Sequence, residues 1–124
     1  MAWEKSSPAL VALFDRAVPD DPRVERRQMF GYPAAFANGN LFIGLHRQDF
    51  VIRLSAADRV AFTAHYGDHP FAPMPGRPMH AYVRLPAALM EDEAERAQWI
   101  ARALANALTL PAKVAKPRRK AAAG

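Results

Sequence analysis

The sequence predicts an α+β fold: a two-layer sandwich in which helices lie on one face of an antiparallel sheet. Three observations point to this class. Apolar residues recur with helical spacing near both ends of the chain, residues 24–54 combine short apolar runs with turn signals, and residues 80–85 alternate between apolar and polar. A further helical segment separates the last two regions. The expected element order is therefore α-β-β-β-α-β-α.

The first helix is expected over residues 8–18. Ser7 is a suitable N-cap, and Pro8 suits the first helical position, where its missing N–H forms no helical hydrogen bond. One apolar stripe follows with the spacing i, i+3, i+4, i+7; it consists of Leu10, Leu13, Phe14 and Ala17. This helix is thus expected to bury one face against the core.

Residues 24–54 predict a three-stranded antiparallel meander. Asn38-Gly39 is a strong hairpin signal, because a type I′ turn needs positive φ at both central residues. A second turn is expected at Arg47-Gln48-Asp49. In the run that follows, Phe50-Val51-Ile52-Arg53-Leu54, three apolar side chains share one face and Arg53 lies on the other.

A second helix is expected to begin after Ser55, which is its N-cap, and to end near Tyr66 with Gly67 as the C′ residue. Four prolines then exclude regular structure from residues 68–78. We expect Phe71 to anchor this loop to the core.

The last strand is expected at residues 80–85, where Ala81, Val83 and Leu85 face inward. The last helix is expected to run from Glu91 to Leu108, with Trp99 on its flank. Its apolar stripe is formed by Ala97, Ile100, Ala101, Leu104 and Leu108.

The composition excludes several classes of protein. The chain has 124 residues and no cysteine, so it has no disulfide framework, thiolate metal site or cysteine nucleophile. No apolar run reaches the length of about 20 residues needed to span a bilayer. The N-terminal residues lack the features of a secretory signal, so a cytoplasmic location is expected. We expect one domain over residues 1–111, followed by a basic, disordered tail at residues 112–124.

No catalytic, cofactor-binding or metal-binding residue is expected. The three serines lie near the N-terminus or at a helix cap, and no nucleophile motif surrounds them. His65 and His69 have the spacing of helical metal ligands, but Gly67 and Pro70 break the continuity of the helix. Glycine-rich phosphate-binding loops are absent. We therefore expect a protein that is not an enzyme.

The uncovered face of the sheet is a candidate surface for partner binding. Arg53, His80, Tyr82 and Arg84 are expected there, because they alternate with residues that face the core. Basic and aromatic side chains together suit an acidic partner, a nucleic-acid strand or a second copy of the chain. The alternative is a solvated face with polar pairs between strands.

The net charge of +5 comes from the tail. Without its five basic residues the chain has as many acidic as basic residues. This cluster could attract phosphate groups, or it could merely increase solubility. It consists of Lys113, Lys116, Arg118, Arg119 and Lys120.

The run Arg26-Arg27-Gln28-Met29-Phe30-Gly31-Tyr32, followed by Phe36, Asn38-Gly39-Asn40 and Leu41-Phe42, resembles the TfoX (Sxy) N-terminal domain family. That family has an R-x-M-F-G segment, an aromatic residue, an N-G pair and a short apolar strand. Further similarities extend the resemblance over residues 10–108. The matching motif residues are Arg27, Met29, Phe30, Gly31, Asn38 and Gly39.

The resemblance implies a small α+β domain of a bacterial regulatory protein. Full-length TfoX-type proteins regulate competence genes together with the cyclic-AMP receptor protein, and they carry a second, helical C-terminal domain. Only the tail follows Leu108, so this chain is expected to be a stand-alone member without that domain. For Met29-Phe30-Gly31 there is also a structural interpretation, with Met and Phe in the core and Gly at a bulge.

The favoured function is a non-enzymatic regulatory or interaction domain that acts through contacts with a protein partner or a second copy of itself. The alternative is nucleic-acid binding by the tail together with Arg53 and Arg84. A small-molecule enzyme that uses His80, Tyr82 and the arginines is the third possibility.

Overall fold

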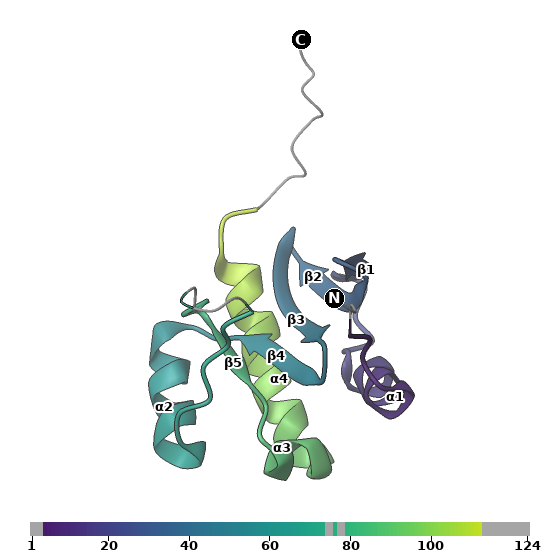
Figure 1. The fold of residues 1–124 in the computed structure, drawn as a ribbon. Coiled ribbons are helices and arrows are strands. Elements are labelled where there is room, and N and C mark those ends of the chain that lie inside the picture. The colour runs from purple at the N-terminus through teal and green to yellow at the C-terminus, as the bar shows by residue number, and fades with distance from the viewer. Residues whose placement is uncertain (1–3, 74–75, 77–78, 113–124) are drawn as a thin grey trace.

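The computed structural model describes residues 4–73, 76 and 79–112 (Figure 1). A five-stranded antiparallel sheet, with the strand order β1-β2-β3-β4-β5, carries helices on one face (Figure 1). The predicted α+β class is therefore confirmed. In chain order the elements are α1 Pro8–Ala17, β1 Val24–Met29, β2 Tyr32–Ala37, β3 Asn40–His46, β4 Asp49–Arg53, α2 Ala56–Tyr66, β5 Tyr82–Arg84, α3 Ala87–Glu91 and α4 Glu93–Thr109.

The predicted succession of helical and strand regions is confirmed, with two additions. The meander has four strands instead of three, because the polar segment β1 pairs along its whole length with β2. A short helix, α3, also separates β5 from α4. The last strand is shorter than expected: β5 begins at Tyr82, and residues 80–81 form a turn that leads into it.

Two hairpin turns adopt the same unusual backbone conformation. Asn38 and Gly39 have φ values of 54° and 76°, which confirms the predicted turn with positive φ at both residues. Between β1 and β2, Phe30 and Gly31 have φ values of 55° and 84°. Thus a phenylalanine stands where the neighbouring hairpin has an asparagine.

The main core lies between the sheet and the helices. Phe14 of α1, Phe62 of α2 and Ile100 of α4 are almost completely buried there. A register shift between β2 and β3 leaves Phe42 as an extra residue, so Phe42 and its neighbour Ile43 are both buried. Helices α1, α2 and α4 and the central strands thus share one core.

The buried side of α4 differs from the predicted stripe. Ala97 and Ala101 are exposed, whereas Trp99 is buried rather than on a flank. Arg96 is also buried, and its guanidinium donates to the carbonyl oxygens of Leu89 and Met90 at the end of α3. The full buried set is Arg96, Trp99, Ile100, Ala103, Leu104 and Ala107.

Among the described residues, no helix is both long enough and apolar enough to cross a membrane.

Candidate functional site

The loop after α2 partly covers the sheet face that lies opposite α1 and α4, here called the open face. Phe71 was expected to anchor this loop to the core. It is buried instead on the open face, where its ring centroid lies 5.5 Å from that of His46 and 6.4 Å from that of Tyr82. Backbone bonds from Met79 N–H to Phe71 O (2.8 Å) and from Arg84 N–H to His69 O (2.9 Å) fix the loop beside β5. The open face therefore has a small apolar cluster of its own.

An apolar cavity of about 100 Å³ lies between the open face and this loop. Small side chains form its floor and leave room above the sheet, since Ala34, Gly44 and Val51 lie next to one another on three adjacent strands. A Cβ atom at Gly44 would meet Pro33 and Ala34 only at ordinary contact distances of 3.6–3.8 Å. The cavity is lined by Met29, Phe30, Tyr32, Ala34, Leu41, Gly44, Leu45, His46, Val51, Phe71, Pro73, Met79 and Tyr82.

Two large apolar side chains on the lining of this cavity face solvent. Phe30 is 84% exposed and Met79 is 39% exposed. The structural interpretation that placed Phe30 in the core is therefore wrong: the tight turn at Phe30-Gly31 directs this side chain outward. A phenylalanine with positive φ is strained, and such strain is concentrated at functional sites.

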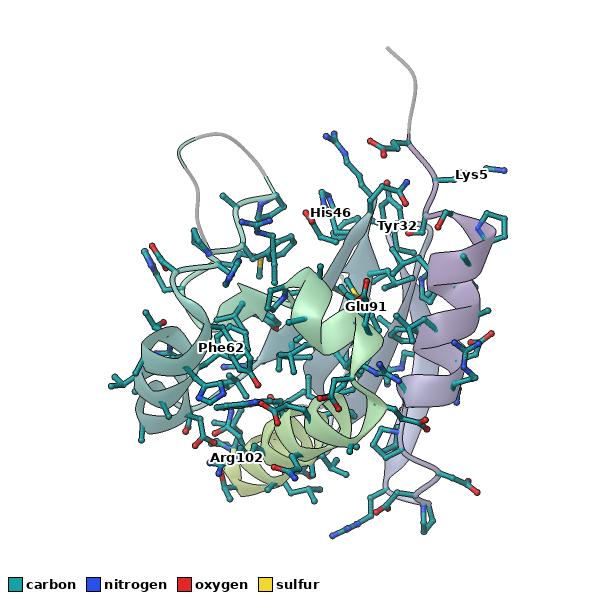
Figure 2. The ribbon with its side chains drawn as sticks, turned by 90° about the horizontal axis from the view of Figure 1, so that it is seen from below. Lys5, Tyr32, His46, Phe62, Glu91 and Arg102 are labelled. Carbon is teal, nitrogen blue, oxygen red and sulfur yellow. The ribbon has the colours of Figure 1, made fainter. Side chains whose placement is uncertain are left out.

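His46 is a titratable group that lies among the aromatic rings of the cavity. Tyr32 lies on its other side, with ring centroids 5.4 Å apart (Figure 2), and the Tyr32 hydroxyl donates to the carbonyl oxygen of Glu4. Burial lowers the pKa of His46 below its ordinary value, and the charge of Arg47 lowers it further, against the opposing charges of Asp49 and Glu4. His46 therefore presents a neutral ring to the cavity at neutral pH.

We expect His46 to make the stability of the domain fall as the pH drops below about 6.5. The folded pKa is lowered, so the unfolded chain binds more protons in this range, and the stabilisation by the neutral ring is lost as the pH falls through the folded pKa. Urea unfolding at about pH 7.5 and about pH 5.5 tests this. The His46→Gln variant should show a smaller difference between the two conditions; an identical difference would contradict the prediction.

The predicted partner-binding residues lie on or beside the open face, but only some of them come together. Arg53 and Tyr82 are directly paired, and the guanidinium carbon of Arg53 lies 5.8 Å from the Tyr82 ring centroid. His80 is in the turn before β5 and shares a neighbouring cavity with Tyr82. Arg84 instead donates through Nε to the carbonyl oxygen of Pro70 at 2.7 Å, and its Nη1 lies 3.9 Å from Asp49 Oδ1.

The neighbouring cavity is polar and measures about 200 Å³. It shares Phe71, Met79 and Tyr82 with the apolar cavity, so the two form one continuous surface. Its other lining residues are Arg59, Thr63, Asp68, Pro70, His80 and Val83. Burial raises the pKa of Tyr82, against the opposing effect of the Arg53 charge.

The other motif residues have structural contacts. Arg27 donates to Glu25 at 2.9 Å, and its guanidinium carbon lies 4.7 Å from the Phe36 ring centroid. Asn38 and the buried Asn40 hold the chain that leaves α4, donating to the carbonyl oxygens of Leu110 (3.0 Å) and Pro111 (3.1 Å), respectively. The N-G-N segment therefore joins the β2–β3 hairpin to the end of α4.

Replacing Asn40 with Ala should lower the free energy of unfolding by about 1 kcal/mol, because the buried amide makes two hydrogen bonds at this junction. Hydrogen exchange should accelerate at the Leu110 amide. The Asn38→Gly variant keeps the turn conformation and removes only the side-chain hydrogen bond to Leu110 O. It should therefore lower the free energy of unfolding by less than Asn40→Ala does. Unchanged exchange at Leu110 in the Asn40 variant would refute this assignment.

The five basic residues of the predicted tail lie outside the described residues: Lys113, Lys116, Arg118, Arg119 and Lys120. Within the described part of the chain, no group of three or more His, Cys, Asp or Glu side chains is placed to hold a metal ion.

Sequence reasoning missed the cavity itself. Its signals were the small residues Ala34 and Gly44 within strands, and His46 at the end of an apolar strand. Neither signal is specific, because a small residue in a strand is also typical of a bulge or a close backbone approach.

Comparison with known proteins identifies the family. A search of curated proteins finds no significant match. The TfoX N-terminal domain matches residues 16–107, about three quarters of the chain, and this range includes every residue that lines the apolar cavity. The chain therefore belongs to the TfoX N-terminal domain family.

Proposed function

We propose that this domain is a non-enzymatic interaction module that binds a segment of a partner protein on its open face, with Phe30 as the anchoring side chain. In a member of this family, such a contact would serve transcriptional regulation. One observation carries the proposal: Phe30 is 84% exposed, has a φ of 55° and lies on an apolar cavity.

The left-handed backbone conformation of Phe30 has a free-energy cost that the fold does not require. The left-handed conformation costs an L-residue about 1 kcal/mol or more, and glycine or asparagine would fill the same turn more easily. The β2–β3 turn of this chain does have asparagine in that conformation. A binding role for the phenylalanine ring accounts for both its strain and its exposure.

The chemistry of the apolar cavity favours binding over catalysis. Among its described lining residues there is no serine, carboxylate or lysine, and its polar groups are His46, Tyr32 and Tyr82. The neutral imidazole of His46 lies between two aromatic rings. An apolar surface with a few hydrogen-bonding groups is typical of a recognition site.

Charge balance supports a protein partner over nucleic acid or a second copy. Arg27 and Arg84 on the open face already have carboxylate neighbours, which weakens their attraction for phosphates. Pairing of two β1 edges about a two-fold axis at Arg26 or at Arg27 would place that arginine opposite its own copy. Both features favour a different protein as the partner.

Co-purification of the tagged full chain from its host tests this proposal. A specific partner should be retained by the wild type and lost with Phe30→Asn, and also with Gly44→Val, which fills the floor of the cavity. Val60→Asn is the control, since Val60 is 72% exposed on α2, away from the cavity. The proposal fails if folded Phe30 and Gly44 variants retain the same partners as the control.

A further inference from the structure

Arg53 differs from the other strand arginines of the open face in lacking a carboxylate partner. Arg27 lies 2.9 Å from Glu25, and Arg84 lies 3.9 Å from Asp49. No ion pair joins Arg53 to any acidic residue in the described part of the chain; its neighbour is the ring of Tyr82. This cation is therefore available to a negative group on a ligand.

Tyr82 places this cation beside the binding surface. The ring lies under the Arg53 guanidinium and also lines both the apolar and the polar cavity. A ligand in the apolar cavity that reaches Tyr82 therefore lies beside the half-buried Arg53 guanidinium. In such a setting, a hydrogen bond to a charged group contributes more than one between neutral groups.

Resting on the proposed function, we infer that the partner segment carries a carboxylate next to its apolar anchor. The apolar side chain occupies the cavity floored by Ala34 and Gly44, and the carboxylate pairs with Arg53. The carboxylate is that of an acidic side chain or of a chain terminus, because both present the same oxygens. The cavity of about 100 Å³ suits one ring or one branched aliphatic side chain rather than a larger group.

A pair of small probes separates the two parts of this recognition. Phenylpropanoate carries a ring and a carboxylate, and phenylpropanamide has the same shape without the charge. In amide NMR titrations of the full chain, the acid should bind about fivefold more tightly than the amide, as expected for a partly exposed ion pair. Both probes should shift the signals of Gly44, Val51 and Tyr82.

Variants at the two arginines provide the matched comparison. Arg53→Gln should weaken binding of the acid to the level of the amide and leave the amide unaffected. Arg84→Gln should have little effect, since its guanidinium is already bonded to Pro70 and faces Asp49. The inference is overturned if acid and amide bind equally, or if Arg53→Gln weakens both equally.

Two further results would identify a different occupant and overturn the inference. If a short single-stranded oligonucleotide binds more tightly than phenylpropanoate and this binding is lost with Arg53→Gln, the occupant is a nucleic acid. A dimer in sedimentation that disappears with Phe30→Asn would indicate a second copy. If the captured partner depends on Phe30 but not on Arg53, the proposed function stands and only the carboxylate inference fails.

Discussion

Replacing Phe30 with Asn is expected to raise the free energy of unfolding by about 0.5–1 kcal/mol while removing partner binding. The residue has a φ of 55° and precedes Gly31 at 84°, so the variant turn would become Asn-Gly, the pair that best fits this conformation. Little packing is lost, because the phenylalanine ring is 84% exposed. Stability and binding should thus change in opposite directions.

Urea unfolding of the wild type, Phe30→Asn and Phe30→Ala measures the two effects separately. Alanine also removes the ring but is still an L-residue ill suited to positive φ, so Phe30→Ala should lose the partner without the gain in stability. If Phe30→Asn is less stable than the wild type, the phenylalanine ring contributes to the fold, and its exposure does not indicate a binding role.

Local signals made most of the fold predictable. Ser7 and Ser55 accept hydrogen bonds as N-caps at the expected helix starts, and Gly67, with a φ of 88°, ends α2 as expected. In each case one residue type satisfies backbone groups within a few positions of itself. Strand β1 had no such signal, because an edge strand with four exposed positions has no apolar alternation.

The buried face of α4 shows why a prediction from residue types alone was wrong. Choosing Ala97 and Ala101 for the stripe avoids placing the charged Arg96 inside. The structure buries Arg96 because α3 ends beside it and supplies carbonyl acceptors, and these come from an element that was not predicted. Tertiary context therefore decided which side of this helix faces the core.

The candidate site was predictable only in its location. Alternation on β4 and β5 correctly placed Arg53 and Tyr82 on the open face. The role of Phe30 was not predictable from residue type, since phenylalanine is usually buried and its exposure depends on the tight turn. The cavity depends on Phe71 and Met79 of a proline-rich loop, whose path over the sheet is set by long-range contacts.

Helix α2 places one fully buried side chain in the core, so its packing is sensitive to a change at that position. Phe62 is the buried residue of this helix. Its ring centroid lies 5.0 Å from that of Tyr66, 5.2 Å from that of Trp99 and 6.4 Å from that of His69. The polar contacts between α2 and α4 are partly exposed and contribute less; they include Tyr66–Glu95, His65–Glu95 and Arg102–Asp58.

Phe62→Ala is therefore expected to lower the free energy of unfolding by about 3–5 kcal/mol, as for a fully buried aromatic residue. Val60→Ala on the same helix is the control; its side chain is 72% exposed, so the change should stay within about 0.5 kcal/mol. Urea unfolding gives both values. A loss below about 1 kcal/mol for Phe62→Ala would mean that the polar contacts of the helix hold it in place.

The loss of packing should also reach the binding surface. The loop that carries Phe71 begins at the end of α2, and the ring of His69 in this loop contacts Phe62. If Phe62→Ala frees this end of the loop, hydrogen exchange at the Met79 amide, which donates to Phe71 O, should accelerate more than exchange at the Leu45 amide in the centre of the sheet. Equal acceleration at both would indicate global unfolding, in which case α2 and the cavity are parts of one cooperative unit.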